Sequence, residues 1–191
     1  MKKIIAVAAV IIVAAGLWYG FTLNSKKQTN SSNDYQKYEN TAYGFSLEYP
    51  KTWHATGASA TSTVISFNDT APSEPVEGAE TTSSAVIDIM IIENYDNISL
   101  GEWTDLSLGL GPELNILSEE TIEANNTKFL VKTFTPLKLP EAAPTAAAFT
   151  ALNDEKYFAQ INYMGEEPNF TAGMKHFKHL LSSFQLTSAA P

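Results

Sequence analysis

An unbroken run of twenty uncharged, mostly apolar residues, Ile4–Leu23, constrains this chain more than any other feature of its sequence. A helix rises about 1.5 Å per residue, so a run of this length spans about 30 Å, the hydrocarbon thickness of a bilayer. Lys2 and Lys3 precede the run, and Lys26 and Lys27 follow it. The segment 1–23 therefore predicts one transmembrane helix that anchors everything after it.

The same segment shares features with a cleavable secretory signal. Its lysine start and the small residues at 13–15 fit the pattern of such a signal. A cut after Ala15 would leave a new terminus that is still apolar. Trp18, Tyr19 and Phe21 also fit an aromatic belt at the far membrane interface. We favour an uncleaved, single-pass anchor in the cell membrane over a removed signal, with the C-terminal domain outside the cytoplasm.

Composition divides the remaining chain into three segments. Residues 24–37 open with NSKKQTNSSND, which has no apolar side chain to offset its ordering entropy, so they predict a flexible linker. Residues 38–187 are long enough for one hydrophobic core and predict a single extracytoplasmic domain. Residues 188–191 predict a disordered tail.

Charge and residue usage exclude several classes of function. The chain has a net charge of −9, and residues 52–127 hold thirteen acidic residues and no lysine. It contains no arginine, so nucleic acid is not an expected partner, because such partners favour basic grooves. It also contains no cysteine, which excludes disulfides, a catalytic thiol and a lipid-attached lipoprotein.

Apolar residues at strand periodicity recur through the domain. Two pairs of strands flank short polar turns that tolerate positive φ, Asn125-Asn126 and 153–155, and predict hairpins. Nearly continuous apolar character over 85–92 predicts a central strand covered on both faces. The predicted strands are 41–49, 64–67, 85–92, 116–123, 128–134, 145–152 and 157–163.

Helical spacing appears twice. Ser99 is placed to cap a helix that carries Trp103 on its apolar face and ends at the glycines near 109–111. A second helix starts at Pro168 and has a longer apolar face. That face consists of Phe170, Met174, Phe177, Leu181 and Phe184. Two helices and several strands predict an α+β fold, an α/β/α sandwich with a central antiparallel sheet, preceded by the N-terminal transmembrane helix.

Both ends of the predicted domain resemble the PsbP-like family. Residues 38–53 read YENTAYGFSLEYPKTW, which is similar to that family's opening motif YxNxxYGFSxxYPxxW. Residues 176–186 read HFKHLLSSFQL, which is similar to its closing helix, the "SF" pair and a terminal strand. The resemblance implies an α/β/α sandwich with an antiparallel sheet, and it implies no shared active site. Some members of this family are binding or assembly factors.

Two groups of residues are weak candidates for metal ligands. His176 and His179 are three residues apart and share one face of the last predicted helix. No further ligand follows them at a suitable spacing, so we interpret them as solvated helix residues. Acidic side chains also gather in the loop after residue 68, where prolines interrupt any calcium-loop spacing. These acidic residues are Asp69, Glu74, Glu77 and Glu80.

No catalytic motif and no cofactor-binding fingerprint occurs in the sequence. We therefore expect a non-catalytic binding or assembly module of the PsbP-like type, with the membrane as one partner through Ile4–Leu23 and another envelope protein as a further candidate partner. We expect no enzymatic activity and no cofactor. The alternatives are a carrier of a small ligand or metal, and a hydrolase whose site is built from scattered loops.

Overall fold

The computed structural model describes residues 34–70, 85–109, 113–138, 142–166 and 168–187. The predicted anchor Ile4–Leu23, most of the predicted linker and the predicted tail lie outside these residues. Within the described residues, neither helix is long and apolar enough to cross a membrane.

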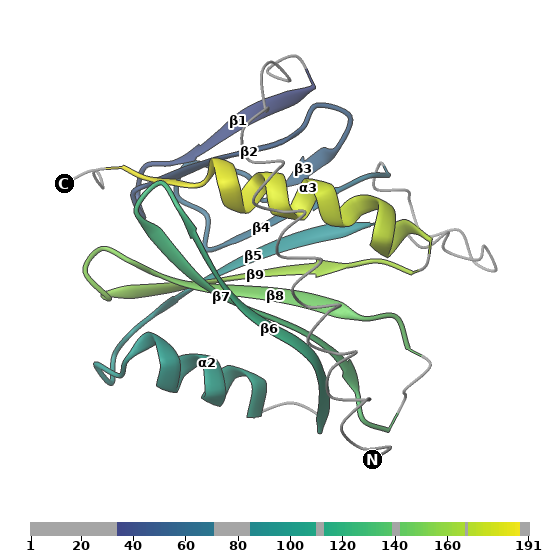
Figure 1. Ribbon diagram of the computed structural model, residues 1–191. Helices are drawn as coiled ribbons and strands as arrows, with labels where there is room; N and C mark the ends of the chain where they lie inside the picture. Colours follow the sequence, from purple (N-terminus) through teal and green to yellow (C-terminus); the bar gives the residue numbers. More distant parts are fainter. Residues whose placement is uncertain (1–33, 71–84, 110–112, 139–141, 167, 188–191) are drawn as a thin grey trace, which may run out of the picture. The chain divides into compact units, whose positions relative to one another are not determined.

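Most of the strands form one antiparallel sheet with the order β3-β4-β5-β9-β8-β7-β6 (Figure 1). The alternation of apolar residues along these strands places one set of side chains on each face of the sheet. The strands are β3 (His54–Thr56), β4 (Val64–Asn68), β5 (Val86–Glu93), β6 (Leu114–Ala124), β7 (Thr127–Pro136), β8 (Thr145–Leu152) and β9 (Tyr157–Met164).

A smaller antiparallel sheet has the order β1-β2-β10. It consists of β1 (Tyr35–Asn40), β2 (Phe45–Pro50) and β10 (Gln185–Leu186). The strand β1 begins inside the segment 24–37 that we predicted to be linker, so the folded domain starts before residue 38. The physical reason is long-range pairing, because Tyr35 lies opposite Pro50 in the ladder.

The two helices lie on opposite faces of the large sheet (Figure 1). On one face, α3 (Asn169–Ser183) buries Phe177, Leu180 and Leu181 in the main core, together with side chains of the smaller sheet. On the other face, α2 (Leu100–Gly109) packs Trp103 against Phe149 and Phe158. The domain is an α+β sandwich, as predicted, and Trp103 is a core residue, as predicted.

The strand β5 is covered more on one face than on the other. Ile87, Ile89 and Ile91 are buried toward α3, whereas Met90 and Ile92 are 38% and 37% exposed on the opposite face. The prediction of a strand covered on both faces is therefore wrong. The short helix α2 packs over β8 and β9, and it reaches β5 near Ile92, which lines a pocket with Trp103 and Leu106.

Local sequence signals fix the turns and one helix start. The Ser99 hydroxyl accepts from the backbone N–H of Glu102, and the Glu102 carboxylate accepts from the backbone N–H of Ser99, which is a capping box. Asn125 and Asn126 have φ values of 48° and 63°, so they form the two-residue turn between β6 and β7. Both predicted hairpins are confirmed.

Candidate functional site

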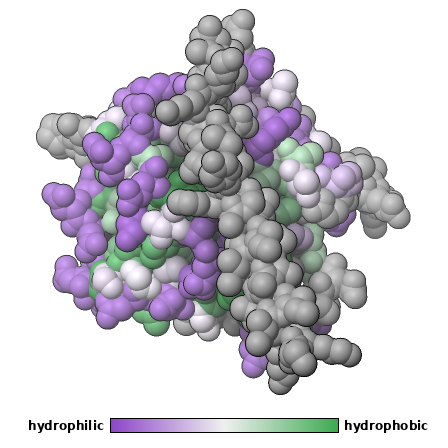
Figure 2. Space-filling model, viewed as in Figure 1, coloured by the Kyte–Doolittle hydropathy of each residue, from purple (hydrophilic) through white to green (hydrophobic). Residues whose placement is uncertain are grey.

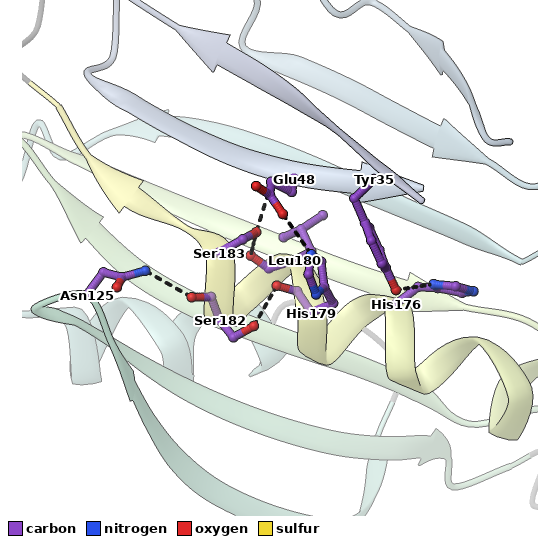
Figure 3. A network of polar contacts seen from close by, with 8 residues as sticks. All are labelled: Tyr35, Glu48, Asn125, His176, His179, Leu180, Ser182 and Ser183. Carbon is purple, nitrogen blue, oxygen red and sulfur yellow. Dashed lines mark hydrogen bonds and ion pairs between the residues drawn. The ribbon is translucent and has the colours of Figure 1, made fainter. Parts of the chain in front are cut away.

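The two histidines that we considered as metal ligands lie at a junction between α3 and the smaller sheet (Figure 3). His176 and His179 come from α3, while Tyr35 opens β1 and Glu48 lies in β2. Figure 3 shows the side chains of Tyr35 and Glu48 directed toward the helix. We call these four residues, with Trp53, the histidine cluster.

His179 is held between Glu48 and Tyr35. Its Nε2 lies 2.9 Å from Oε2 of Glu48, and its side chain is 14% exposed. The ring of Tyr35 stacks on the imidazole with ring centroids 3.6 Å apart. Because a carboxylate only accepts, Nε2 carries the proton and donates it to Glu48. Nδ1 of His179 is buried and has no hydrogen-bond partner among the described residues.

His176 contacts two aromatic side chains. The hydroxyl of Tyr35 lies 2.9 Å from Nδ1 of His176, and the indole of Trp53 meets the imidazole edge-on at 5.6 Å. Burial lowers the pKa of His176, and the positive charges of Lys175 and His179 lower it further. Burial also raises the pKa of Tyr35, with the carboxylates of Asp34 and Glu48 adding to the effect. Both shifts favour the neutral forms of the two side chains, which share one hydrogen bond whose donor depends on the tautomer of His176.

The polar contacts continue from the histidine cluster to the end of α3. The backbone N–H of Glu48 donates to Oγ of Ser183 at 2.9 Å, and that hydroxyl donates to the carbonyl of Leu180. Asn125, in the β6–β7 turn, donates to the carbonyls of Ser182 and Phe184 at 2.9 and 3.0 Å. The C-terminal part of α3 is thus joined to both sheets by side chains (Figure 3).

This geometry corrects our interpretation of His176 and His179 as solvated residues. Helical spacing correctly placed them on one face, but β1 and β2 cover that face through Tyr35 and Glu48. Within the described residues, no group of three or more His, Asp or Glu side chains is arranged to hold a metal ion. Each contact of the histidine cluster joins a strand or loop of the first fifty-three residues to α3, so these contacts stabilise the domain.

Of the four acidic residues in the predicted acidic loop, the structure describes Asp69. Asp69 follows β4, and its backbone N–H donates to the carbonyl of Ala85 at 3.1 Å. Oδ1 of Asp69 is buried and lacks a hydrogen-bond partner among the described residues. Glu74, Glu77 and Glu80 lie outside the described residues, so a cation site in this loop stays a prediction.

A groove between α2 and the β6–β7 hairpin is the second candidate site, and our sequence reasoning missed it. It has a volume of about 370 Å³, and its polar lining includes Asp105, Glu119, Glu120 and Lys132. Nζ of Lys132 lies 3.4 Å from Asp105 and 3.3 Å from Glu119. One sequence signal could have indicated an acidic surface here. Residues 52–127 contain no lysine, so Asp105, Glu119 and Glu120 have few positive charges near them in the sequence.

The described surface combines polar and apolar side chains. On the face drawn in Figure 2, hydrophilic residues lie beside exposed hydrophobic ones. Near the start of β6, Ile116 and Leu117 are 40% and 53% exposed, and Leu106 on α2 is 54% exposed.

Solved structures reveal what this domain is similar to. No protein-family model matches the sequence, and no curated protein is a significant match to it. Cyanobacterial PsbP from Synechocystis superposes with a TM-score of 0.52 at 14% identity, covering 85% of this chain and 99% of that one. The domain has a PsbP-like fold.

Two further structures share this PsbP-like fold. LpqN, involved in cell envelope biogenesis of Mycobacterium tuberculosis, gives a TM-score of 0.56 at 12% identity, covering 81% of this chain and 92% of that one. The Ran-binding protein Mog1p of Saccharomyces cerevisiae gives a TM-score of 0.53 at 14% identity, and the match covers 81% of this chain and 96% of Mog1p. At these identities the likeness concerns the fold alone, and it confirms the fold implied by the sequence motifs at 38–53 and 176–186.

Proposed function

We propose that this protein is a membrane-anchored binding or assembly module whose PsbP-like domain works outside the cytoplasm without catalysing a reaction. The observation that carries the proposal is a PsbP-like domain that follows an apolar run long enough to span a bilayer, Ile4–Leu23. In this proposal the run holds the protein in the cell membrane, and the domain binds another envelope protein.

Two similar folds support the binding and envelope aspects of the proposal. Mog1p is described as Ran-binding, and LpqN is described as involved in envelope biogenesis. The contacts of the histidine cluster join β1 and β2 to α3, so we assign them a structural role. The groove beside β6 leaves charged and apolar groups exposed for a partner.

Membrane attachment is tested by fractionation of cells that produce the full chain. We expect the protein to stay with the membranes during alkaline extraction and its domain to be open to protease added outside the cells. The variant Ile12→Arg places a charge in the middle of the apolar run and should lower membrane retention, because a central arginine costs about 2.5–3.5 kcal/mol. Release of the unchanged protein by alkali would contradict the anchor.

Binding is tested by crosslinking in intact membranes followed by purification of the full chain. We expect a defined envelope protein to co-purify with the wild type, since the domain carries the binding surface and the apolar run holds it at the membrane. Turnover of a substrate by the purified protein, or a bound small molecule or metal with no protein partner, would instead support the alternatives of a hydrolase or a carrier.

A further inference from the structure

The outer edge of β6 is long and open. β6 is the last strand of the seven-stranded sheet, and among the described residues no strand pairs with its outer side. It has 11 residues, whereas β3 at the opposite edge has 3. A strand at a sheet edge presents unpaired N–H and C=O groups along its length, and short edges such as β3 limit that exposure. The edge of β6 is therefore the one within the described sheet that could accept a strand of useful length.

The register of the hairpin identifies the backbone groups that face outward. The two-residue turn at 125–126 is closed by a pair of residues that exchange hydrogen bonds, and such pairs alternate along an antiparallel ladder. This alternation turns the backbone groups of Glu119, Thr121 and Glu123 away from β7. The register shifts at Leu117, where a bulge interrupts the ladder. A strand added here would pair with the segment between the bulge and the turn.

Side chains beside this edge set the charge that an added strand would meet. Glu119 and Thr121 line the groove between β6 and α2, and Asp105 lines it from the helix. The groove lining contains three carboxylates and one lysine, and that lysine already lies between Asp105 and Glu119. Side chains of an added strand alternate between the two faces of the sheet, so every second one would lie over this acidic groove.

A second copy of the chain is a poor occupant of this edge. β6 contains Glu119, Glu120 and Glu123 and no lysine, so two such edges would bring like charges together. Like charges directly opposite each other destabilise strand pairing, whereas opposite charges stabilise it. A cationic strand would therefore be attracted where a second copy of β6 would be repelled.

We propose that the outer edge of β6 binds an extended segment of a partner protein by strand addition, and that this segment carries lysine or arginine at alternate positions. Main-chain hydrogen bonds to Glu119, Thr121 and Glu123 supply the attachment, and the acidic groove supplies the preference for cationic side chains. This inference rests on the proposed function and specifies the chemistry of its partner.

The test uses the full chain in detergent micelles and two short synthetic peptides. In one peptide lysine alternates with valine, and in the other glutamate takes the place of lysine. We expect the lysine peptide alone to bind, and its affinity to fall at least about tenfold between about 0.05 M and about 0.5 M salt, because exposed charges are screened. Amide hydrogen exchange should slow at Glu119, Thr121 and Glu123 when this peptide is bound.

Two variants separate the backbone contribution from the charge contribution. Thr121→Pro removes one outward N–H while leaving the bonds to β7 in place, so it should weaken peptide binding at least about tenfold. The double variant Asp105→Asn with Glu119→Gln keeps the backbone and should weaken binding mainly at low salt. Glu39→Gln on β1 is the matched control for loss of an exposed carboxylate and should leave binding unchanged.

Each other outcome overturns the inference. Equal binding of the two peptides, unchanged binding by both groove variants, or protection at amides outside β6 would show that the edge does not recognise a cationic strand. A protein that dimerises through β6 would make a second copy the occupant. If an envelope protein co-purifies equally with the wild type, with Thr121→Pro and with the double variant, the proposed function stands and this inference fails. If neither a peptide nor an envelope protein binds, both fail.

Discussion

The ring of Tyr35 stacks on the imidazole of His179 with 3.6 Å between ring centroids, although the two residues lie at opposite ends of the domain sequence. The same tyrosine places its hydroxyl 2.9 Å from Nδ1 of His176. One side chain at the start of β1 therefore contacts two successive turns of α3. This contact fixes the point at which the folded domain begins, immediately after the segment that leads from the predicted anchor.

Replacing Tyr35 should loosen the start of β1. Tyr35→Ala removes the stack and the hydrogen bond and should lower the free energy of unfolding by about 2–4 kcal/mol, as for truncation of a packed aromatic ring. Tyr35→Phe keeps the stack and loses only the hydroxyl, so it should cost about 0.5–1.5 kcal/mol. Urea unfolding measures both changes, and amide exchange in β1 should rise in Tyr35→Ala.

Tyr95→Ala is the matched control for this experiment, because Tyr95 is 79% exposed. It should leave the unfolding free energy nearly unchanged. Equal effects of the Tyr35 and Tyr95 variants would mean that the contacts of Tyr35 with α3 contribute nothing to stability.

The histidine cluster should make stability depend on pH. Burial lowers the pKa of His176 in the folded domain, whereas the unfolded chain has the ordinary histidine pKa of about 6.5. Between these two pKa values the unfolded state binds more protons, so acidification favours unfolding. Stability should therefore be retained above about pH 6.5 and decline as the pH falls through the lowered pKa of His176. Urea unfolding at a series of pH values measures this slope.

The variant His176→Asn tests whether His176 causes this pH dependence of stability. The asparagine side chain keeps a hydrogen-bonding group near the position of Nδ1 but does not titrate, so the variant should lose part of the pH dependence. His54→Asn on the exposed strand β3 is the matched control and should follow the wild type. A pH profile that is the same for wild type and His176→Asn would exclude His176 as the source of the slope.

Signals that depend on neighbouring residues in the chain predicted much of this fold. The asparagine turn at 125–126 and the cap at Ser99 act over two to four residues, and both occur where the sequence placed them. The apolar face of α3 and the core position of Trp103 also follow from spacing alone, whereas Leu106, which has the same helical spacing in α2, is 54% exposed. The local sequence of each of these elements determines its backbone conformation, so contacts with distant residues did not alter it.

Contacts between distant segments account for what the sequence did not predict. β1 reads YQKYEN, whose polar residues resemble those of the preceding linker, and only its pairing with β2 and its contact with α3 reveal a strand. The environments of His176 and His179 depend on the same contact. The groove beside β6 combines Asp105 of helix α2 with Glu119 of β6 and Lys132 of β7, and no local pattern joins these three residues.

A close approach between α3 and β9 makes Gly173 sensitive to substitution. A Cβ atom at Gly173 would lie 2.2 Å from the hydroxyl of Tyr163, which donates to the carbonyls of Asn169 and Phe170. Gly173→Ala should therefore destabilise the domain by about 1–3 kcal/mol, as overpacking of a core does, despite the higher helix propensity of alanine. Thermal unfolding followed by circular dichroism measures the change.

Gly101→Ala is the matched control, because Gly101 lies in α2 and a Cβ atom there meets nothing within 4 Å. Alanine should stabilise that helix by about 0.5–1 kcal/mol. We therefore expect glycine-to-alanine substitution to lower the free energy of unfolding at Gly173 and to raise it at Gly101. A stabilising effect at both positions would show that Tyr163 moves aside at little cost.

The side chain of Asn125 should link the β6–β7 hairpin to the end of α3. Its Nδ2 donates to the carbonyls of Ser182 and Phe184, and its φ of 48° is one that asparagine and glycine adopt readily. Asn125→Gly keeps the turn but removes both donated bonds, so it should lower the free energy of unfolding by about 1–3 kcal/mol. Asn126→Gly in the same turn, at a φ of 63°, controls for the added glycine and should cost less. Equal costs at the two positions in urea unfolding would mean that the turn conformation, and not the link to α3, is what Asn125 contributes.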